Sequence, residues 1–366
     1  MFSSLSPVTK RNIVKIVPFG LIWLALGLIF MFIEYVAIGD FNNVSTTAIR
    51  VNPEILAFAS IAVTMLGLLI GVIEVVWLNK TLSSKSFTIK LVYKLVFYLV
   101  FLFLVILVTF PIAASMELET GLFDQRVWAK YVAYLTSMTN LSTFVQMSVS
   151  LFACLFYAEI SENIGQNVLL NFFTGKYHQP VEEKRVFMFL DMKSSTTIAE
   201  QLGHITYFKL LKEYYNTLTH AIIKHGGEVY QYIGDEIVIS WPFEKGLQNQ
   251  NCVRSFLAMK QDLENRSAYF QKTFGVIPTF KVGIHAGLVT TGEIGALKKE
   301  IIFTGDVLNT TARIQALCNE LGVDNLISKE LADQLPDTDS LSFESMGTHD
   351  LKGKIASIEL VTMFDF

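Results

Sequence analysis

Charged residues are scarce in this chain, at 17% against roughly 25% in an ordinary soluble domain. The shortage accompanies a hydrophobic content of 52% and a mean hydropathy of +0.44. A basic field is also missing, since 29 basic residues face 33 acidic ones, which argues against nucleic acid as a partner. The three cysteines are too few and too widely spaced for a disulfide framework or a zinc site. These absences indicate a membrane protein with a domain in a reducing compartment.

Four apolar stretches occupy the first 160 residues, at 13–38, 55–78, 91–114 and 131–160. Each is longer than the roughly 20 residues that a helix needs to cross the hydrocarbon of a bilayer. We therefore predict a four-helix transmembrane domain over 1–160, which makes the lipid bilayer a partner.

The basic residues of the connecting segments predict the orientation. Seven lie before the first span or around the second connection, and three lie in the other two loops. Because lysine and arginine concentrate on the cytoplasmic side, the N-terminus is expected inside, and four crossings return the chain to the cytoplasm. The protein is then a multi-pass protein of the inner (plasma) membrane. The seven are Lys10, Arg11, Lys15, Lys80, Lys85, Lys90 and Lys94, and the three are Arg50, Arg126 and Lys130.

Histidine is missing from the spans, and so is a lysine at mid-depth, which excludes a histidine-ligated haem and makes a retinal Schiff base improbable. Two carboxylates, Glu34 and Glu74, fall inside the apolar stretches. Each lies within about a turn of a predicted span end, so we expect hydrated side chains there.

A linker is predicted over 161–184. Ile160, Ile164 and Val168 recur at helical spacing, so the fourth helix is expected to continue beyond the membrane with an apolar stripe. The stripe suits either a stiff spacer or a transmitter that forms a dimer. Gly175 and Pro180 are expected to end this helix.

Strands and helices alternate from Arg185 onward. The pattern predicts a β-α-β-β-α-β core with additions, an α+β fold of ferredoxin-like type over 185–366. The expected strands are 186–190, 229–233, 236–241, 280–288 and 301–303, and the expected helices are 197–224, 247–272 and one that begins near 306.

The first candidate segment for chemistry follows the first of these strands. A buried strand delivers Asp191 at its end and then turns into a helix whose first residues, including Thr196, carry hydroxyl groups. The free N–H groups of a helix start suit a phosphate, and a carboxylate beside them suits its metal ion. The alternative is an ordinary helix N-cap.

The second segment places Asp235 at the tip of a hairpin with a Gly-Asp turn, where turn chemistry alone would favour aspartate. Two strands of one sheet can bring Asp191 and Asp235 together. Paired carboxylates can hold two divalent ions for an in-line phosphoryl displacement, and magnesium suits such oxygen ligands.

In the third segment Asn309 and Arg313 are four residues apart and share one helix face. An amide and a guanidinium aimed the same way suit a ribose oxygen and the charge that develops on phosphate. An ordinary exposed polar face is the alternative.

Together the three segments resemble the class III nucleotidyl cyclases, the adenylyl and guanylyl cyclases, over roughly 185–360. The resemblance implies cyclisation of a nucleoside triphosphate by attack of the ribose 3′-oxygen on the α-phosphate, with release of pyrophosphate. It implies two Mg²⁺ or Mn²⁺ ions per site, held by Asp191 and Asp235 with the backbone carbonyl of Met192. It also implies that Asn309 and Arg313 stabilise the transition state and that Thr196 and Lys352 contact the substrate.

The residues at the base-contacting positions depart from the family pattern. Gln231 stands where adenylyl cyclases carry lysine and guanylyl cyclases glutamate, and Ile302 stands where a polar residue is usual. Thr304 faces the same side of the strand as Ile302 and could replace it. A glutamine amide can pair with adenine or with guanine. The base therefore stays open; ATP is favoured because adenylyl cyclases predominate in the family.

The resemblance also implies a homodimer of head-to-tail catalytic domains, because the metal-binding and Asn/Arg residues of one site come from different subunits. Two alternatives remain. The run from Tyr232 to Glu236 is similar to the signature of diguanylate cyclases, although Ile233 replaces a glycine there. A non-catalytic membrane receptor is the other.

Overall fold

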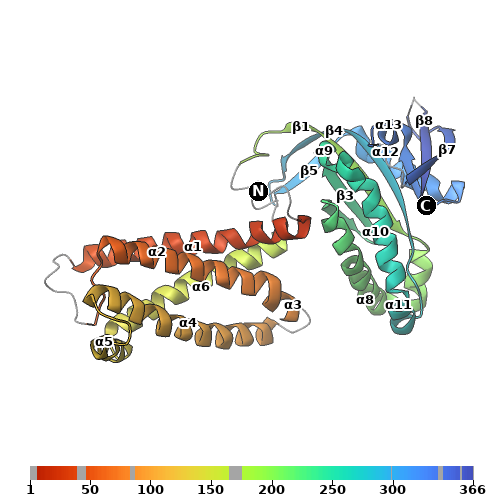
Figure 1. Ribbon diagram of the computed structural model, residues 1–366. Helices are drawn as coiled ribbons and strands as arrows, with labels where there is room; N and C mark the ends of the chain where they lie inside the picture. Colours follow the sequence, from red (N-terminus) through yellow and green to blue (C-terminus); the bar gives the residue numbers. More distant parts are fainter. Residues whose placement is uncertain are drawn as a thin grey trace. The chain divides into compact units, whose positions relative to one another are not determined.

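The computed structural model describes residues 6–38, 47–82, 87–164, 175–297, 299–336, 341–354 and 357–365. The chain divides into two compact units, Thr9–Leu169 and Leu170–Phe366 with Met1–Val8. The first is helical and the second is built on a β-sheet (Figure 1). The predicted fold class, an apolar helical region followed by an α+β domain, is confirmed.

The helical unit contains four helices that are long and apolar enough to cross a membrane, at Pro7–Glu34, Pro53–Leu78, Val92–Leu118 and Met138–Glu162. The second span ends in a π-helix. The elements are α1 (Pro7–Ile38), α2 (Pro53–Val72), the π-helix (Ile73–Leu78), α3 (Asn79–Leu82), α4 (Phe87–Leu118), α5 (Gln125–Leu135) and α6 (Met138–Ile164).

The predicted start of the fourth span was wrong. The stretch 131–160 is not one helix, because α5 ends at Leu135 and α6 begins at Met138. Ser137 accounts for the break: its hydroxyl donates to the Tyr134 carbonyl oxygen (2.7 Å) and accepts from the Asn140 N–H (3.2 Å). The side chain therefore satisfies main-chain groups at the end of one helix and the start of the next.

The expectation of a hydrated carboxylate was wrong for Glu74. Its side chain lies in the π-helix and is 1% exposed. It forms an ion pair with Lys94 and accepts a hydrogen bond from the Tyr98 hydroxyl (2.8 Å). A cation from α4 thus compensates the charge that water would otherwise solvate. Glu34 is exposed and accepts a hydrogen bond from Gln146 (2.8 Å).

An eight-stranded sheet forms the second unit, in the order β2-β3-β1-β4-β6-β8-β7, with β5 paired to β4. All pairings are antiparallel except β4 with β6. The strands are β1 (Val181–Met192), β2 (Glu228–Ile233), β3 (Glu236–Pro242), β4 (Phe280–Ile294), β5 (Glu300–Thr304), β6 (Asn325–Ser328), β7 (Leu341–His349) and β8 (Ile358–Asp365).

The two faces of the sheet carry different helices. Met188 and Leu190 of β1 belong to a large core with α8 and α10, whereas Phe187 and Phe189 pack in a smaller core with Val307 of α12. This alternation follows from the two-residue period of a strand. The helices are α8 (Ser195–Lys224), α9 (Phe243–Leu247), α10 (Asn251–Asn265), α11 (Ser267–Phe274), α12 (Asp306–Leu321) and α13 (Lys329–Ala332), with a short 3₁₀ turn at Gln248–Gln250.

Several details differ from the prediction for this unit. The strand β1 begins at Val181, inside the predicted linker 161–184. The expected helix 197–224 is kinked at Gly203, where the backbone is not helical (φ 70°). The expected helix 247–272 is divided, because α9 ends at Leu247, α10 begins at Asn251, and the backbone leaves the helical region again at Arg266, between α10 and α11. For the strands β6, β7 and β8 the sequence predicted no bounds; this part of the chain was expected only as additions to the core. Of the predicted linker stripe, α6 is described as far as Ile164, and Val168 lies outside the described residues.

The helix α12 lies very close to β4. A Cβ atom at Gly283 would be 2.7 Å from both the Thr311 carbonyl oxygen and the Gln315 Cβ, and one at Gly287 would be 3.0 Å from the Val307 Cβ. Real Cβ atoms do not approach other atoms as closely as 2.7 Å, so β4 requires glycine at Gly283.

Candidate active site

Asp191 stands at the end of β1 and is held by two side chains of its own chain. Its carboxylate oxygen Oδ2 lies 3.3 Å from the Lys281 ammonium and accepts a hydrogen bond from the Gln315 amide (3.2 Å). Lys281 is the direct partner of Asp191 in the β1–β4 register, and Gln315 comes from α12. Asp191 is 28% exposed, so it remains accessible at the surface.

The hairpin between β2 and β3 brings Asp235 to Asp191. Ile233 pairs with Glu236 across the two-residue turn, and Gly234 takes the left-handed conformation that such turns require (φ 63°). Burial and the hydrogen bond and negative charge of Asp235 raise the pKa of Asp191, against the opposing effect of Lys281. Burial and the two aspartates likewise raise the pKa of Glu236. The positive charge of Lys281 therefore does not compensate the negative charge of these three carboxylates.

Met192 follows Asp191 at the last position of β1. Its side chain is buried in the core on the α8 face of the sheet. The residue as a whole is 1% exposed and pairs with Phe280 of β4, so its main-chain carbonyl, the group assigned to it from the sequence, is the one oxygen that it could offer to a ligand.

The start of α8 differs from an ordinary cap. Ser194 occupies the N-cap position with a left-handed backbone (φ 56°) and makes no side-chain cap hydrogen bond. Thr196 in the first turn is exposed. Capping by the Ser194 side chain therefore does not explain the hydroxyl groups at the start of α8. The N–H groups of its first turn stay available to another acceptor.

Asn309 and Arg313 lie on the side of α12 that faces away from the sheet. Val307 and Thr311 are the residues of α12 that meet Gly287 and Gly283 of β4. Successive helix residues are about 100° apart, so a position two residues from each of these is directed roughly opposite to β4. Asn309 is exposed and Arg313 half-buried.

Lys352 is close to the same end of α12. It lies in a turn closed by a hydrogen bond from the Lys354 N–H to the Leu351 carbonyl (2.9 Å). The buried Leu351 anchors the turn, and Lys354 forms an ion pair with Asp306 (2.6 Å), a contact that lowers the pKa of Asp306. The Arg313 guanidinium also lies beside this turn, with Nη2 3.6 Å from where a Cβ on Gly353 would be.

The base-contacting candidates lie on β2 and β5. Gln231 is exposed on β2. Ile302 pairs with Gly292 and Thr304 with Thr290, so the two share one side of β5, as the sequence predicts. The two strands do not pair with each other, but the Phe303 N–H donates to the Tyr230 hydroxyl (3.3 Å).

The predicted residues thus form two groups. We call Asp191, Asp235 and the Met192 carbonyl the metal half-site, and Asn309, Arg313 and Lys352 the helix half-site. The structure brings the members of the metal half-site together. It places Arg313 beside the turn that carries Lys352, with Asn309 one turn earlier on α12. It does not bring the two half-sites of one chain together. The helix half-site faces away from β4, and β4 is the strand that pairs with β1 at Asp191.

Four side chains that hold these groups were not predicted from the sequence. Lys281 and Gln315 contact Asp191, and Asp306 and Lys354 tie the Lys352 turn to α12. The sequence could have indicated Lys281, because a lysine is unusual in the otherwise apolar strand 280–288. It could not have indicated Gln315, since a glutamine in an amphipathic helix is ordinary.

Comparison with known proteins places this unit in a family. Residues 177–364 match the model of the adenylate and guanylate cyclase catalytic domain. Adenylate cyclase 2 of Rhizobium meliloti (strain 1021) is 31% identical over 209 residues, which cover 57% of this chain and 58% of that protein. Adenylate cyclase 1 of the same organism is 27% identical over 179 residues, 47% of this chain and 26% of that protein. This chain therefore spans less than two thirds of either relative.

A solved structure has the same fold. A bacterial light-regulated adenylyl cyclase superimposes with a TM-score of 0.51 at 22% identity, over 60% of this chain and 64% of that one. The family match covers more than half of the chain and includes both half-sites. By that match, this chain belongs to the family of the adenylate and guanylate cyclase catalytic domain.

Proposed function

We propose that this protein is a membrane-bound adenylate cyclase, which converts ATP to 3′,5′-cyclic AMP and pyrophosphate at the interface of a homodimer. The observation that carries the proposal is the meeting of Asp191 and Asp235 at one end of the sheet, in a site short of positive charge. Two carboxylates that repel each other at one place argue against the alternative of a non-catalytic receptor, because such a protein gains nothing from this repulsion.

The metal half-site fits divalent cations. Its donors are carboxylate and carbonyl oxygens, which are the ligands that Mg²⁺ and Mn²⁺ prefer. No cluster of three or more acidic, histidine or cysteine side chains suited to a metal occurs in the described parts of the chain, so phosphate oxygens of the substrate would complete the coordination. Two such ions would supply positive charge to the attacking 3′-oxygen and to the leaving pyrophosphate.

The chain's own residues position the substrate. Thr196 and the first turn of α8 offer hydroxyl and N–H donors to the phosphates. Asn309 orients the ribose, and Arg313 and Lys352 stabilise the charge that develops on the phosphates as the bond to pyrophosphate breaks. The proton of the 3′-hydroxyl passes to solvent or to a phosphate oxygen.

A second copy of the chain would complete each site. The helix half-site faces away from the metal half-site of its own chain, so we assign the pair in each active site to different subunits, arranged head to tail. Exposed apolar side chains support such a contact. They occur on α8, at Ile205 (76% exposed) and Phe208 (71%), and beside Asp235 on β2, at Tyr232 and Ile233.

The substrate base is assigned as adenine, supported by the adenylate cyclases among the relatives. Gln231 and Ile302 carry no charge that would exclude guanine, so GTP is the second candidate.

The same proposal extends to organisation and location. The four apolar helices anchor the domain 1–160 in the inner (plasma) membrane, and the catalytic domain is cytoplasmic, where nucleotides are abundant. The predicted division into a linker 161–184 and a domain 185–366 is shifted, because β1 begins at Val181 and the family match at residue 177. Reporter fusions at the two termini test this orientation, and an extracytoplasmic signal at either end would contradict it.

The decisive experiment is a product assay on the purified full chain with ATP or GTP, each with Mg²⁺ or Mn²⁺, followed by mass spectrometry. Cyclic AMP as the main product supports the proposal, and cyclic GMP would reassign the substrate. Linear or dinucleotide products, or no product from a verified dimer, would overturn it.

A further inference from the structure

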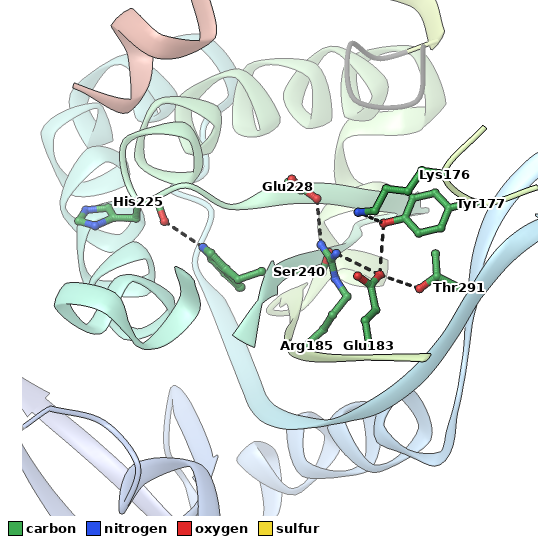
Figure 2. A network of polar contacts seen from close by, with 9 residues as sticks. Lys176, Tyr177, Glu183, Arg185, His225, Glu228, Ser240 and Thr291 are labelled. Atoms are coloured by element: carbon green, nitrogen blue, oxygen red, sulfur yellow. Dashed lines mark hydrogen bonds and ion pairs between the residues drawn. The ribbon is translucent and has the colours of Figure 1, made fainter. Parts of the chain in front are cut away.

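A buried cation lies behind the base-contacting strands. Arg185 of β1 is 3% exposed. Its Nη2 donates to Glu228 on β2 (2.9 Å) and to Ser240 on β3 (3.0 Å), and its Nη1 lies 3.3 Å from Glu183 (Figure 2). Because both ends of the guanidinium are engaged, its plane is fixed.

Glu183 extends these contacts to β4 and to the segment before β1. Its carboxylate accepts hydrogen bonds from Thr291 (2.7 Å) and from the Tyr177 hydroxyl (3.4 Å), as Figure 2 shows. Thr291 is the direct partner of Phe303 in the β4–β5 register. The polar network therefore reaches the strand position opposite Phe303.

Phe303 of β5 is held on several sides. The Arg185 guanidinium lies 4.7 Å from the centre of its ring, and the rings of Tyr230 and Phe187 lie 4.7 Å and 5.5 Å away. The Phe303 N–H also donates to the Tyr230 hydroxyl. A cation–π contact, two ring contacts and a main-chain hydrogen bond thus fix one residue of β5, a strand that, among those described, pairs with β4 alone.

The neighbours of these residues in the chain are the base-contacting candidates. Ile302 and Thr304 flank Phe303 and face the opposite side of β5, and Gln231 follows Tyr230 directly. The cluster thus contacts both strands that carry the base-contacting candidates. On β5 the Phe303 ring faces away from Ile302 and Thr304, and on β2 Tyr230 stands at an irregularity of the β2–β3 register, directly before Gln231.

We infer that Arg185, Tyr230 and Phe303, which we call the β5 clamp, are positioning residues that set the base selectivity of the cyclase. The clamp fixes where Ile302, Thr304 and Gln231 meet the base, and a displacement of about 1 Å at such positions is enough to change rates severalfold or more. The inference rests on the proposed function.

The test compares Phe303→Leu and Tyr230→Phe with the wild-type full chain. Phe303→Leu removes the ring that Arg185 and Tyr230 hold, and Tyr230→Phe removes only the hydroxyl that accepts from β5. We expect Phe303→Leu to raise KM for ATP about tenfold with a much smaller change in kcat, and to change the ATP:GTP ratio of kcat/KM. Tyr230→Phe should shift both quantities in the same direction by a smaller factor.

Tyr269→Leu is the matched control. Tyr269 lies under the Arg266 guanidinium (4.4 Å) on the helical side of the same unit, so its loss removes a similar contact at another place. Thermal unfolding of each variant gives the structural effect. If Phe303→Leu changes activity no more than Tyr269→Leu, with an unchanged ATP:GTP ratio, the clamp is structural only and the inference fails.

Equilibrium binding of ATP and GTP to the same proteins separates the inference from the proposed function. A wild-type protein that binds the two nucleotides with different affinities but makes no cyclic product refutes the proposed activity. The inference then stands if Phe303→Leu changes the ratio of affinities, and falls if it does not. A wild-type protein that binds neither nucleotide overturns both.

Discussion

The metal half-site is held from within the chain, whereas the helix half-site is presented outward. Asp191 has contacts from β4 and from α12 and shares its surroundings with Asp235 and Glu236. Asn309 and Lys352 are exposed. Under the proposed function, this difference means that one chain carries two incomplete sites of opposite kind. One would need added positive charge, and the other would offer donors and cations to a partner subunit.

The largest expected effect tests whether the half-sites act across subunits. Asp191→Ala and Arg313→Ala should each lower kcat by at least about 100-fold, because each removes a charge that acts in the transition state. Co-expression of the two should restore about a quarter of the wild-type activity, since half of randomly formed dimers are mixed and each has one intact site. The measurement is cyclic nucleotide production by the co-purified proteins.

A control pair makes this test specific. Asp191→Ala with Asp235→Ala damages the metal half-site in both subunits, so no intact site can form and no activity should return. Recovery in this control, or its absence in the first pair despite verified mixed dimers, contradicts the division of the site between subunits.

A smaller effect is expected when the packing of α12, which carries most of the helix half-site, against β4 is disturbed. Gly283→Ala places a methyl group against Thr311 and Gln315 and should lower the free energy of unfolding by about 1–3 kcal/mol, as overpacking of a close contact does. Thermal unfolding of the purified chain measures it. Gly292→Ala on the same strand is the control, because its Cβ would be 3.4 Å from the nearest atom. Equal stability of both variants would show that α12 can move aside.

Acid should also lower the stability of this part of the fold. His285 on β4 hydrogen-bonds with Ser328 (2.8 Å), and burial lowers its pKa to about 4, with Glu330, Lys354 and Asp306 as the nearby charges. Since the unfolded state binds the proton more readily, the stability from neutral His285 is complete above pH 6.5 and is lost as the pH falls toward 4. Between pH 7.5 and pH 5 the loss should be about 2 kcal/mol.

Unfolding of His285→Gln at the two pH values measures this effect. The variant should lose less stability than the wild type on acidification, whereas His204→Gln, at an exposed position of α8, should behave like the wild type. Identical pH dependence of all three proteins would exclude His285 as the titrating group.

The smallest effect concerns the base. Gln231→Lys should raise the ATP:GTP ratio of kcat/KM about tenfold, because an ammonium group only donates, while the Watson–Crick edge of guanine presents two donors. Competition between the two nucleotides measures the ratio. Gln261→Lys, on the exposed face of α10, adds the same charge elsewhere and should leave the ratio unchanged.

The sequence predicted the positions of the metal half-site well because each aspartate is tied to a local pattern. Asp191 ends a continuous apolar strand, and Asp235 occupies a two-residue turn between two apolar runs. Such patterns are fixed by neighbours in the chain. The proximity of the two carboxylates then follows from sheet topology.

Other features could not be predicted because they depend on residues distant in the chain. The burial of Glu74 depends on Lys94 and Tyr98, and the β5 clamp joins Arg185 to Phe303, which lies more than 100 positions later in the chain. The helix break at Ser137 is local, but it depends on which main-chain groups one hydroxyl contacts. Hydropathy and periodicity do not record such contacts.

The glycines under α12 have a mechanical consequence. With no side chain between them, helix and strand approach closely, so we expect the spacing between the two half-sites of one subunit to vary little. In the proposed dimer, we then expect a signal that opens or closes an active site to shift one subunit against the other rather than to bend the catalytic domain.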